Sequence, residues 1–94
     1  MPIFDWDAEK ARINLSKHGV AFEDAARVFL DPLAVREQDR IVDGEERWQT
    51  IGTFDNHKLI VVAHTSIDDE SGEEFIRIVS ARKAERHERR RYEG

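Results

Sequence analysis

The side chains best suited to binding a charged substrate lie in the last segment of the chain, residues 75–94. From Arg82 to Arg91 this segment has six basic and two acidic side chains, a net charge of +4, whereas the whole 94-residue chain has a net charge of −5. The guanidinium fork of arginine matches the oxygens of a phosphate. The segment is therefore a candidate phosphate-binding region, although the overall acidity of the chain argues against a general nucleic-acid coat.

Three candidate residues belong to the predicted strand 75–81 and its end. Arg77 lies between Ile76 and Ile78, so its side chain points to the opposite face of the strand from theirs. An arginine in this position is commonly a snorkelling or ion-paired structural residue, and a phosphate clamp is the alternative. Ser80 and Arg82 share one face where the strand ends, either as reactive groups or as a solvated strand end.

Further candidates come from the middle of the chain. Arg47 lies on a neighbouring predicted strand and could reach the same surface. Alternation places Glu46 on the other face and Glu45 on the face of Arg47, so Glu45 is the better candidate base. His64 ends the most apolar strand, and it is either a hydrogen-bonded core residue or a general acid or base, since histidine titrates near pH 7.

Other residues are candidates for binding rather than catalysis. Lys17 and His18 end a predicted helix, where its dipole favours positive charge, and a plain helix terminus is the alternative explanation. Tyr92 could stack on a base or act as an acid, or it is an ordinary packed or frayed residue. The basic side chains of the predicted C-terminal helix are potential anchors: Lys83, Arg86, Arg89 and Arg90.

Neither the histidines nor the cysteine count suggests a metal site. The four histidines lack a ligand spacing such as HxxxH, and the chain has no cysteine. We therefore expect no metal and no cofactor, and we expect His57 and His87 to be structural or solvated.

Two short helices are predicted to precede the strands. The first spans 8–18, capped by Asp5 or Asp7 and ended by Gly19. Its predicted buried face contains Ala8, Ala11, Leu15 and His18. The second helix spans about 22–30, with an apolar stripe at helical spacing, and Pro32 ends it.

The rest of the chain reads as a sheet followed by a helix. The predicted strands are 33–41 at an edge, 47–54, 59–63 buried on both faces, and 75–81, with turns at Asp43-Gly44 and Asp55-Asn56 and a disordered polar tip at 67–72. The helix 83–92 has little apolar surface, so we expect it to pack on a partner or to extend partly free. One α+β domain results, ordered β-α-α-β-β-β-β-α, with an antiparallel sheet, two N-terminal helices on one face and a basic C-terminal helix.

An ordered set of short motifs resembles the BrnT family, the ribonuclease toxins of a type II toxin–antitoxin system. The resemblance covers nearly the whole chain, and Arg77 to Ala84 is its most telling part. Ala21 departs from it, because a serine or threonine helix cap is expected there, and the polar insert 68–72 looks longer than the family needs. The motifs are Phe4-Asp5-Trp6-Asp7, Lys17 to Val20, Phe22 to Ala25, Asp31 to Ala34, Glu45 to Arg47, Thr50 to Gly52, and Arg77 to Ala84.

The resemblance implies a RelE-like fold and metal-independent RNA cleavage that inhibits translation. It also implies neutralisation by a small antitoxin in a hetero-oligomer, expected to be a heterotetramer, which contacts operator DNA only through the antitoxin. The residues themselves leave a second hypothesis open, in which the basic helix binds nucleic acid or a protein without chemistry.

The sequence also indicates where the protein is found. The amino terminus lacks the basic start and apolar run of a signal peptide, and no segment reaches the ~18 apolar residues of a membrane span. We therefore expect a cytoplasmic protein with no membrane association.

Overall fold

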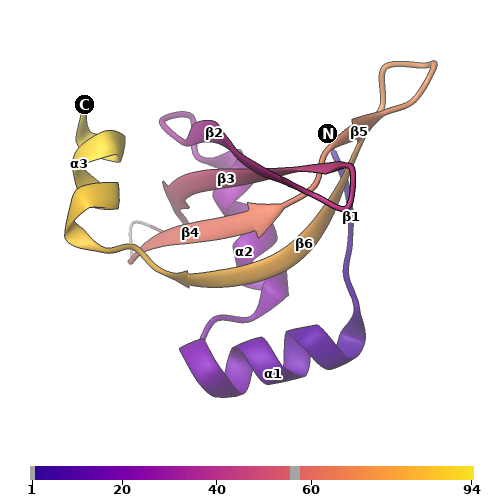
Figure 1. Cartoon of the computed structure of the whole chain (residues 1–94). Helices are drawn as coiled ribbons and strands as arrows, with labels where there is room; N and C mark the ends of the chain where they lie inside the picture. Colours follow the sequence, from indigo (N-terminus) through magenta and orange to yellow (C-terminus); the bar gives the residue numbers. More distant parts are fainter. Residues whose placement is uncertain (1, 56–57) are drawn as a thin grey trace.

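The computed structural model describes residues 2–55 and 58–94 and has an α+β fold (Figure 1). The strands form a sheet in the order β1-β6-β4-β3-β2, and β5 pairs with β6. The elements are β1 (Ile3–Asp5), α1 (Ala8–His18), α2 (Phe22–Arg27), the 3₁₀ turn η1 (Val28–Leu30), β2 (Val35–Val42), β3 (Glu45–Thr53), β4 (Leu59–His64), β5 (Ile67–Asp68), β6 (Glu74–Lys83) and α3 (Arg86–Glu93).

The α+β class and the order of the main elements are confirmed, with two additions. The short strand β5 was not predicted. In addition, β1 pairs in parallel with β6, with Ile3 opposite Phe75, whereas the other pairings are antiparallel. The sheet is therefore mixed at its β1 edge. The chain passes through two helices and several strands after β1 before β6 runs alongside it.

The turns follow the sequence prediction in part. Asp43 and Gly44 both have positive φ, as the predicted hairpin turn requires. Asp55 also has a positive φ, but Asn56 of the second predicted turn lies outside the described residues, as does His57. The prediction of a disordered tip at 67–72 is wrong, because the Asp69 carboxylate accepts hydrogen bonds from the backbone N–H groups of Ser71 and Glu73, both at 2.9 Å.

Helix α1 has the predicted ends but a different buried face. The Asp7 carboxylate accepts a hydrogen bond from the Lys10 N–H, and Gly19 adopts the left-handed conformation at the end. Leu15, however, is 51 % exposed, and the buried residue of the helix is Asn14. The predicted face of Ala8, Ala11, Leu15 and His18 is therefore wrong, although Ala11 does pack against the core.

The Asn14 side chain makes the hydrogen bonds that a neighbouring strand would otherwise make to Ala81. Its side-chain amide donates to the Ala81 carbonyl at 2.8 Å and to the Val20 carbonyl at 3.0 Å, and its oxygen accepts from the Ala81 N–H at 3.1 Å. Because β1 ends at Asp5, the outer edge of β6 has no strand partner at Ala81. The Asn14 side chain satisfies those backbone groups and fixes α1 against the sheet.

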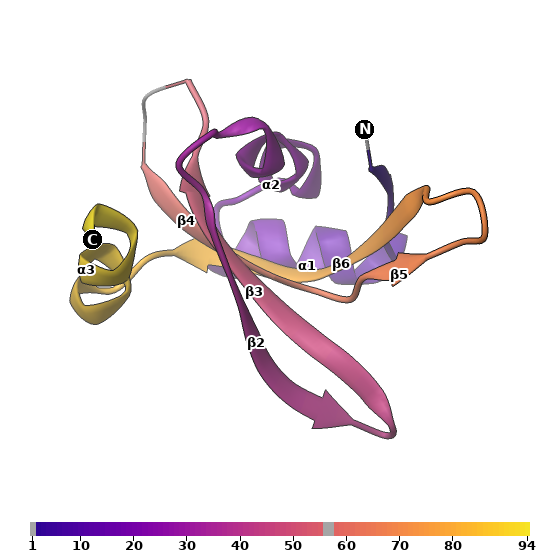
Figure 2. The ribbon, with the colours of Figure 1, turned by 90° about the horizontal axis from the view of Figure 1, so that it is seen from above.

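The main core lies between the sheet and helices α1 and α2 (Figure 2). It is formed by alternate residues of β4 and β6 with Phe22, Ala25 and Val28 from the helical segments. Ala21, the N-cap of α2, provides no side-chain hydrogen bond, as expected for this residue. The packing is tight at Gly52, where an added Cβ would lie 2.9 Å from a methyl carbon of Val28.

Helix α3 packs on the protein, which corrects the expectation of a partly free helix. Tyr92 contacts a second apolar cluster of Ile51, Leu59, Val61 and Ala84, which alternation places on the other face of the sheet from α1 and α2. Figure 2 shows α3 beside the end of β6, away from the other two helices. The strand β6 also continues to Lys83, so the helix begins later than predicted, at Arg86.

Candidate active site on the open face of the sheet

Five of the six predicted catalytic residues lie on one face of the sheet. Alternate residues of β4 and β6 such as Ile60, Val62, Ile76 and Ile78 face the main core, so Arg77 faces the other way. The register of β6 against β4 shifts between Ile78 and Ser80, and after this shift Ala81 faces the core, so Ser80 and Arg82 also face the other way. We call this other side the open face. Its charged and polar members from the predicted site are Glu45, Arg47, Arg77, Ser80 and Arg82.

Strand register sets the spacing of these residues. Ser80 lies opposite Ala63, and Ala63 lies opposite Gln49, two residues along β3 from Arg47. The Thr65 N–H, one residue beyond β4, donates to the Arg77 carbonyl at 3.0 Å. Since paired strands are about 4.8 Å apart, Arg47 on β3 and Arg77 on β6 are separated by about 10 Å of backbone, within reach of two arginine side chains.

Arg47 has an unusual environment for a surface arginine. Its Nε atom is buried and has no hydrogen-bond partner within residues 2–55 and 58–94. The nearest acidic group is the Glu45 carboxylate, whose Oε1 lies 3.8 Å from this nitrogen, beyond hydrogen-bonding distance. A buried donor without an acceptor costs about 1–3 kcal/mol, so the Arg47 Nε–H would gain from an acceptor that is not part of the described chain.

Arg77 is also available, because its partner holds it weakly. Its guanidinium lies 3.3 Å from the Asp5 carboxylate, and the two side chains are 59 % and 62 % exposed. Exposed pairs of this kind stabilise a protein by no more than about 1 kcal/mol. An incoming phosphate can therefore replace Asp5 at little cost.

Arg82, in contrast, is held by its own protein. Its two terminal nitrogens donate to the two carboxylate oxygens of Glu88, both at 2.7 Å. Glu88 is 3 % exposed, and it also accepts from the Glu85 N–H at 2.8 Å. The Arg82 fork lowers the pKa of Glu88 to about 2. This pair fastens α3 to β6, and it occupies the fork that was predicted to hold a phosphate.

His64 lies on the core side of the sheet rather than on the open face. It is fully buried and packs edge-on against Phe29, with ring centroids 4.9 Å apart. Nδ1 lies 3.0 Å from the Thr65 carbonyl, which can only accept, so Nδ1 carries the hydrogen. Nε2 therefore accepts from the Thr50 hydroxyl at 2.7 Å. This geometry favours the hydrogen-bonded core role over the catalytic one.

Burial of His64 predicts a stability change with pH. Desolvation lowers its pKa from 6.5 to about 4, so the folded protein keeps the ring neutral where the unfolded chain protonates it. The contribution of His64 to the free energy of unfolding is therefore fully present above pH 6.5. It falls between pH 6.5 and 4, by about 3 kcal/mol at most. Urea denaturation across this range should show the loss, and His64→Gln should remove it. An equal slope in the variant would contradict this assignment.

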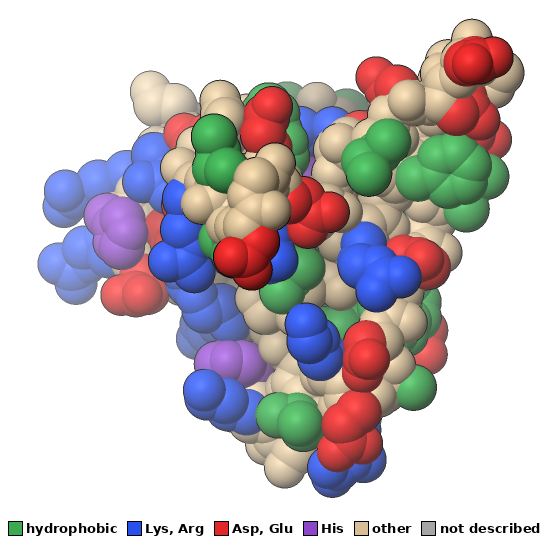
Figure 3. Space-filling model, turned by 45° about the vertical axis from the view of Figure 1, so that its right-hand side comes forward, with side chains coloured by type: hydrophobic (Ala, Val, Ile, Leu, Met, Phe, Trp, Pro, Cys, Tyr) green, Lys and Arg blue, Asp and Glu red, His purple; other side chains and the backbone are tan. Residues whose placement is uncertain are grey.

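The predicted binding residues meet at one end of the molecule, which we call the basic edge. It combines the end of α1, the end of β6 and the exposed side of α3, and Figure 3 shows basic side chains gathered on the side that carries α3. None of these side chains has an ion pair in the described part of the chain, whereas Arg12, Arg27, Arg36 and Arg91 are all paired. The members are Lys17, His18, Lys83, Arg86, Arg89 and Arg90.

Tyr92 does not belong to the basic edge. Its hydroxyl donates to the Asp31 carboxylate at 2.7 Å, and this bond, with burial, raises the pKa of Tyr92. The ring packs on the second apolar cluster. Its position favours the packed role over base stacking or acid catalysis.

Comparison with known proteins agrees with this architecture. The model of a family described as the ribonuclease toxin, BrnT, of type II toxin–antitoxin systems matches residues 6–88. The chain belongs to the BrnT family.

A solved relative confirms the fold of this BrnT family member. The crystal structure of the Brucella abortus ribonuclease toxin BrnT superposes with a TM-score of 0.64 at 24 % sequence identity, covering 92 % of this chain and 100 % of that one. No curated protein sequence matches the chain. No helix in the described ranges is long and apolar enough to cross a membrane.

Two features of this BrnT family member escaped prediction because they depend on tertiary contacts. Glu88 was counted only as an acidic residue of the last helix, yet it is the buried partner of Arg82. Lys58, which directly precedes β4, was not among the predicted site residues, yet it lines a pocket with His18 and Lys83. An acidic residue among the arginines of the last helix is the signal that pointed to the first, and no local signal marked the second.

Proposed function

We propose that this ribonuclease toxin cleaves RNA on the open face of its sheet, without a metal, by attack of a ribose 2′-hydroxyl. The observation that carries the proposal is the buried Arg47 Nε, a donor with no acceptor of its own in the described chain. A scissile phosphate supplies such an acceptor. Its oxygens become more negative as the reaction proceeds, so a fixed guanidinium stabilises the transition state more than the ground state.

The residues of the open face divide the reaction between them. Arg47 and Arg77 hold the phosphate from two strands, with Ser80 between them and the end of β6. Glu45, whose carboxylate lies beside Arg47, takes the 2′-hydroxyl proton. The 2′-oxygen then bonds to phosphorus, the bond to the 5′-oxygen breaks, and the 5′-oxygen takes up a proton. The products are a 2′,3′-cyclic phosphate and a 5′-hydroxyl.

Two predicted catalytic residues have other roles in this proposal. Arg82 positions α3 through Glu88 and thereby orients the basic edge, which anchors the RNA outside the cleaved bond. His64 supports β3 and β4 from the core side. Both assignments rest on the hydrogen bonds described above.

The proposal includes the partner that the family implies. An antitoxin neutralises the toxin in a heterotetramer in the cytoplasm, operator DNA is contacted only by the antitoxin, and RNA cleavage inhibits translation. An apolar patch beside Arg77 supports a protein partner. It consists of Phe75 with its two register neighbours Ile3 and Ile67, which are 42–59 % exposed.

A second candidate function is a binding module without chemistry, which the unpaired cations of the basic edge favour. The two functions differ in their products. We expect the purified chain to cut single-stranded RNA in EDTA, to leave 2′,3′-cyclic phosphate ends, and to stop when antitoxin is added. If folded protein binds RNA with a steep salt dependence and leaves both free and ribosome-associated RNA intact, the binding module is correct and the nuclease is not.

A further inference from the structure

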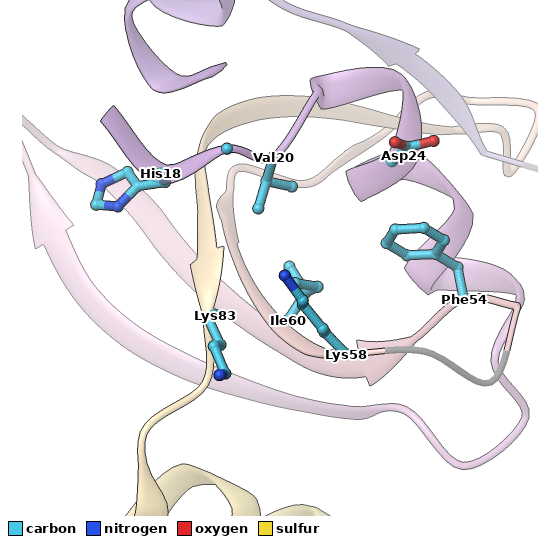
Figure 4. A pocket seen from close by; sticks show the side chains of 8 residues that line it. His18, Val20, Asp24, Phe54, Lys58, Ile60 and Lys83 are labelled. Carbon is cyan, nitrogen blue, oxygen red and sulfur yellow. The ribbon is translucent and has the colours of Figure 1, made fainter. Parts of the chain in front are cut away.

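A pocket of about 600 Å³ lies on the helix side of the sheet, at the end where β4 begins and β6 finishes (Figure 4). Its volume is within the range of small-ligand sites, about 300–1,000 Å³. The apolar surface comes from Val20, Phe54 and Ile60, and the polar and charged groups are His18, Asp24, Lys58 and Lys83. The open face is on the other side of the sheet, so this pocket is a separate site.

The basic side chains of the pocket have no ion-pair partner among the described residues. His18, Lys58 and Lys83 have no ion pair or side-chain hydrogen bond within the described ranges. Asp24, the acidic residue of the lining, lies 3.7 Å from Arg27, which offsets part of its charge. In a protein of net charge −5, two unpaired lysines and a histidine around an apolar surface favour a ligand that is both anionic and partly apolar.

The side chains divide the pocket into an aromatic side at Phe54 and a basic side at His18 and Lys83. In Figure 4 the Lys58 amine lies over the pocket, with Phe54 on one side and His18 and Lys83 at the rim on the other. The Phe54 ring also has the Arg27 guanidinium 5.3 Å from its centroid. Aromatic and aliphatic side chains of this kind bind the flat faces of bases, and neighbouring cations bind phosphate.

We propose that this pocket binds one nucleotide of the RNA, at a distance from the bond that is cut. The base lies against Phe54, Val20 and Ile60, and Lys58 holds its phosphate with His18 and Lys83. This inference rests on the proposed function for its link to RNA cleavage, but the pocket itself binds nucleotides whether or not the open face is catalytic.

The end of β6 connects the two sites. Lys83 follows Arg82 directly, and alternation places their side chains on opposite faces of the sheet. Lys83 lies opposite Ile60 on β4, and Arg82 lies opposite Val61. An RNA strand that crosses the end of β6 therefore passes from the open face along the basic edge into the pocket, so that residues on both faces of the sheet contribute to substrate binding.

Nucleotide titration followed by NMR tests the proposal without requiring cleavage. With 5′-AMP or 5′-CMP as the probe, we expect the methyl signals of Val20 and Ile60 to shift, and Lys58→Ala to weaken the affinity at least threefold. Inorganic phosphate alone and adenosine alone should each bind more weakly than the nucleotide. Arg40→Ala is the matched control, because it removes one exposed, unpaired positive charge near the tip of the β2–β3 hairpin.

Three results would overturn the inference. The first is a set of shifts confined to the open face or α3. The second is equal weakening by Lys58→Ala and Arg40→Ala, which would mean that only net charge matters. The third is a pocket that responds to a glutamate-rich peptide and not to nucleotides, which would assign it to a protein partner. A chain that binds nucleotides here and never cuts RNA would refute the nuclease proposal alone.

Discussion

Arg47→Ala is expected to lower kcat/KM for RNA cleavage by about 10²–10³-fold, the usual cost of removing one preorganised donor from a transition state. The folded protein should be as stable as the wild type, or more stable by about 1 kcal/mol, because the substitution removes a buried donor without a partner. Cleavage of a labelled RNA in EDTA, with urea denaturation of the same samples, measures both quantities.

Two further variants separate the role of Arg47 from its charge. Arg47→Lys keeps the positive charge and loses the fork, so it should recover only a small part of the lost activity. Arg40→Ala removes a similar charge elsewhere on the β2–β3 hairpin and should keep nearly full activity. If Arg47→Ala is folded and cleaves RNA at the wild-type rate, the open face does not hold the scissile phosphate through this residue.

Glu88→Gln is expected to give the largest loss of stability, about 2–3 kcal/mol. Breaking a fully buried pair costs about 3–5 kcal/mol, and the value here is lower because the Arg82 side chain is 33 % exposed and can reach water. Circular dichroism during urea denaturation measures the loss. Glu93→Gln is the matched control on the same helix, because Glu93 is exposed, and it should leave stability unchanged.

The same pair predicts how the protein responds to acid. The pKa of Glu88 is lowered from 4.5 to about 2 by Arg82, so its contribution is complete above pH 4.5 and disappears as the pH falls towards 2. The difference in stability between wild type and Glu88→Gln should therefore shrink over this interval. A difference that stays constant down to pH 2 would show that the Arg82–Glu88 pair is not what fastens α3.

Local sequence patterns were sufficient for much of the fold. Caps and breakers such as Asp7 and Gly19 act within a few residues, and the left-handed Asp43-Gly44 turn is equally local, so the ends of α1 and the position of this hairpin turn followed from the sequence. Strand alternation placed Ser80 and Arg82 on one face for the same reason, whereas Arg77 joins them only through the register shift between Ile78 and Ser80. These inferences needed only the backbone periodicities of helices and strands.

Contacts between distant residues could not be predicted in this way. The apolar stripe of α1 suggested Leu15 for the core, yet Asn14 is buried because the edge of β6 needs hydrogen bonds at Ala81, 67 residues away. The basic helix looked unsupported because its support comes from Glu88, whose burial depends on Arg82. His64 could be assigned to the core only once β4 was known to bring it against Phe29 and Thr50.

The central claim is that the Arg47 guanidinium, whose Nε–H has no hydrogen-bond acceptor in the described chain, binds the phosphate that is cut. The most direct measurement is the side-chain Nε–H resonance of Arg47 by ¹⁵N NMR, during titration with an RNA carrying a 2′-deoxyribose at the cleavage position. This RNA binds and cannot be cleaved by 2′-hydroxyl attack. A large shift of the Arg47 signal, saturating with the RNA, is the predicted result. Saturation of the basic edge with no change at Arg47 Nε would contradict the account.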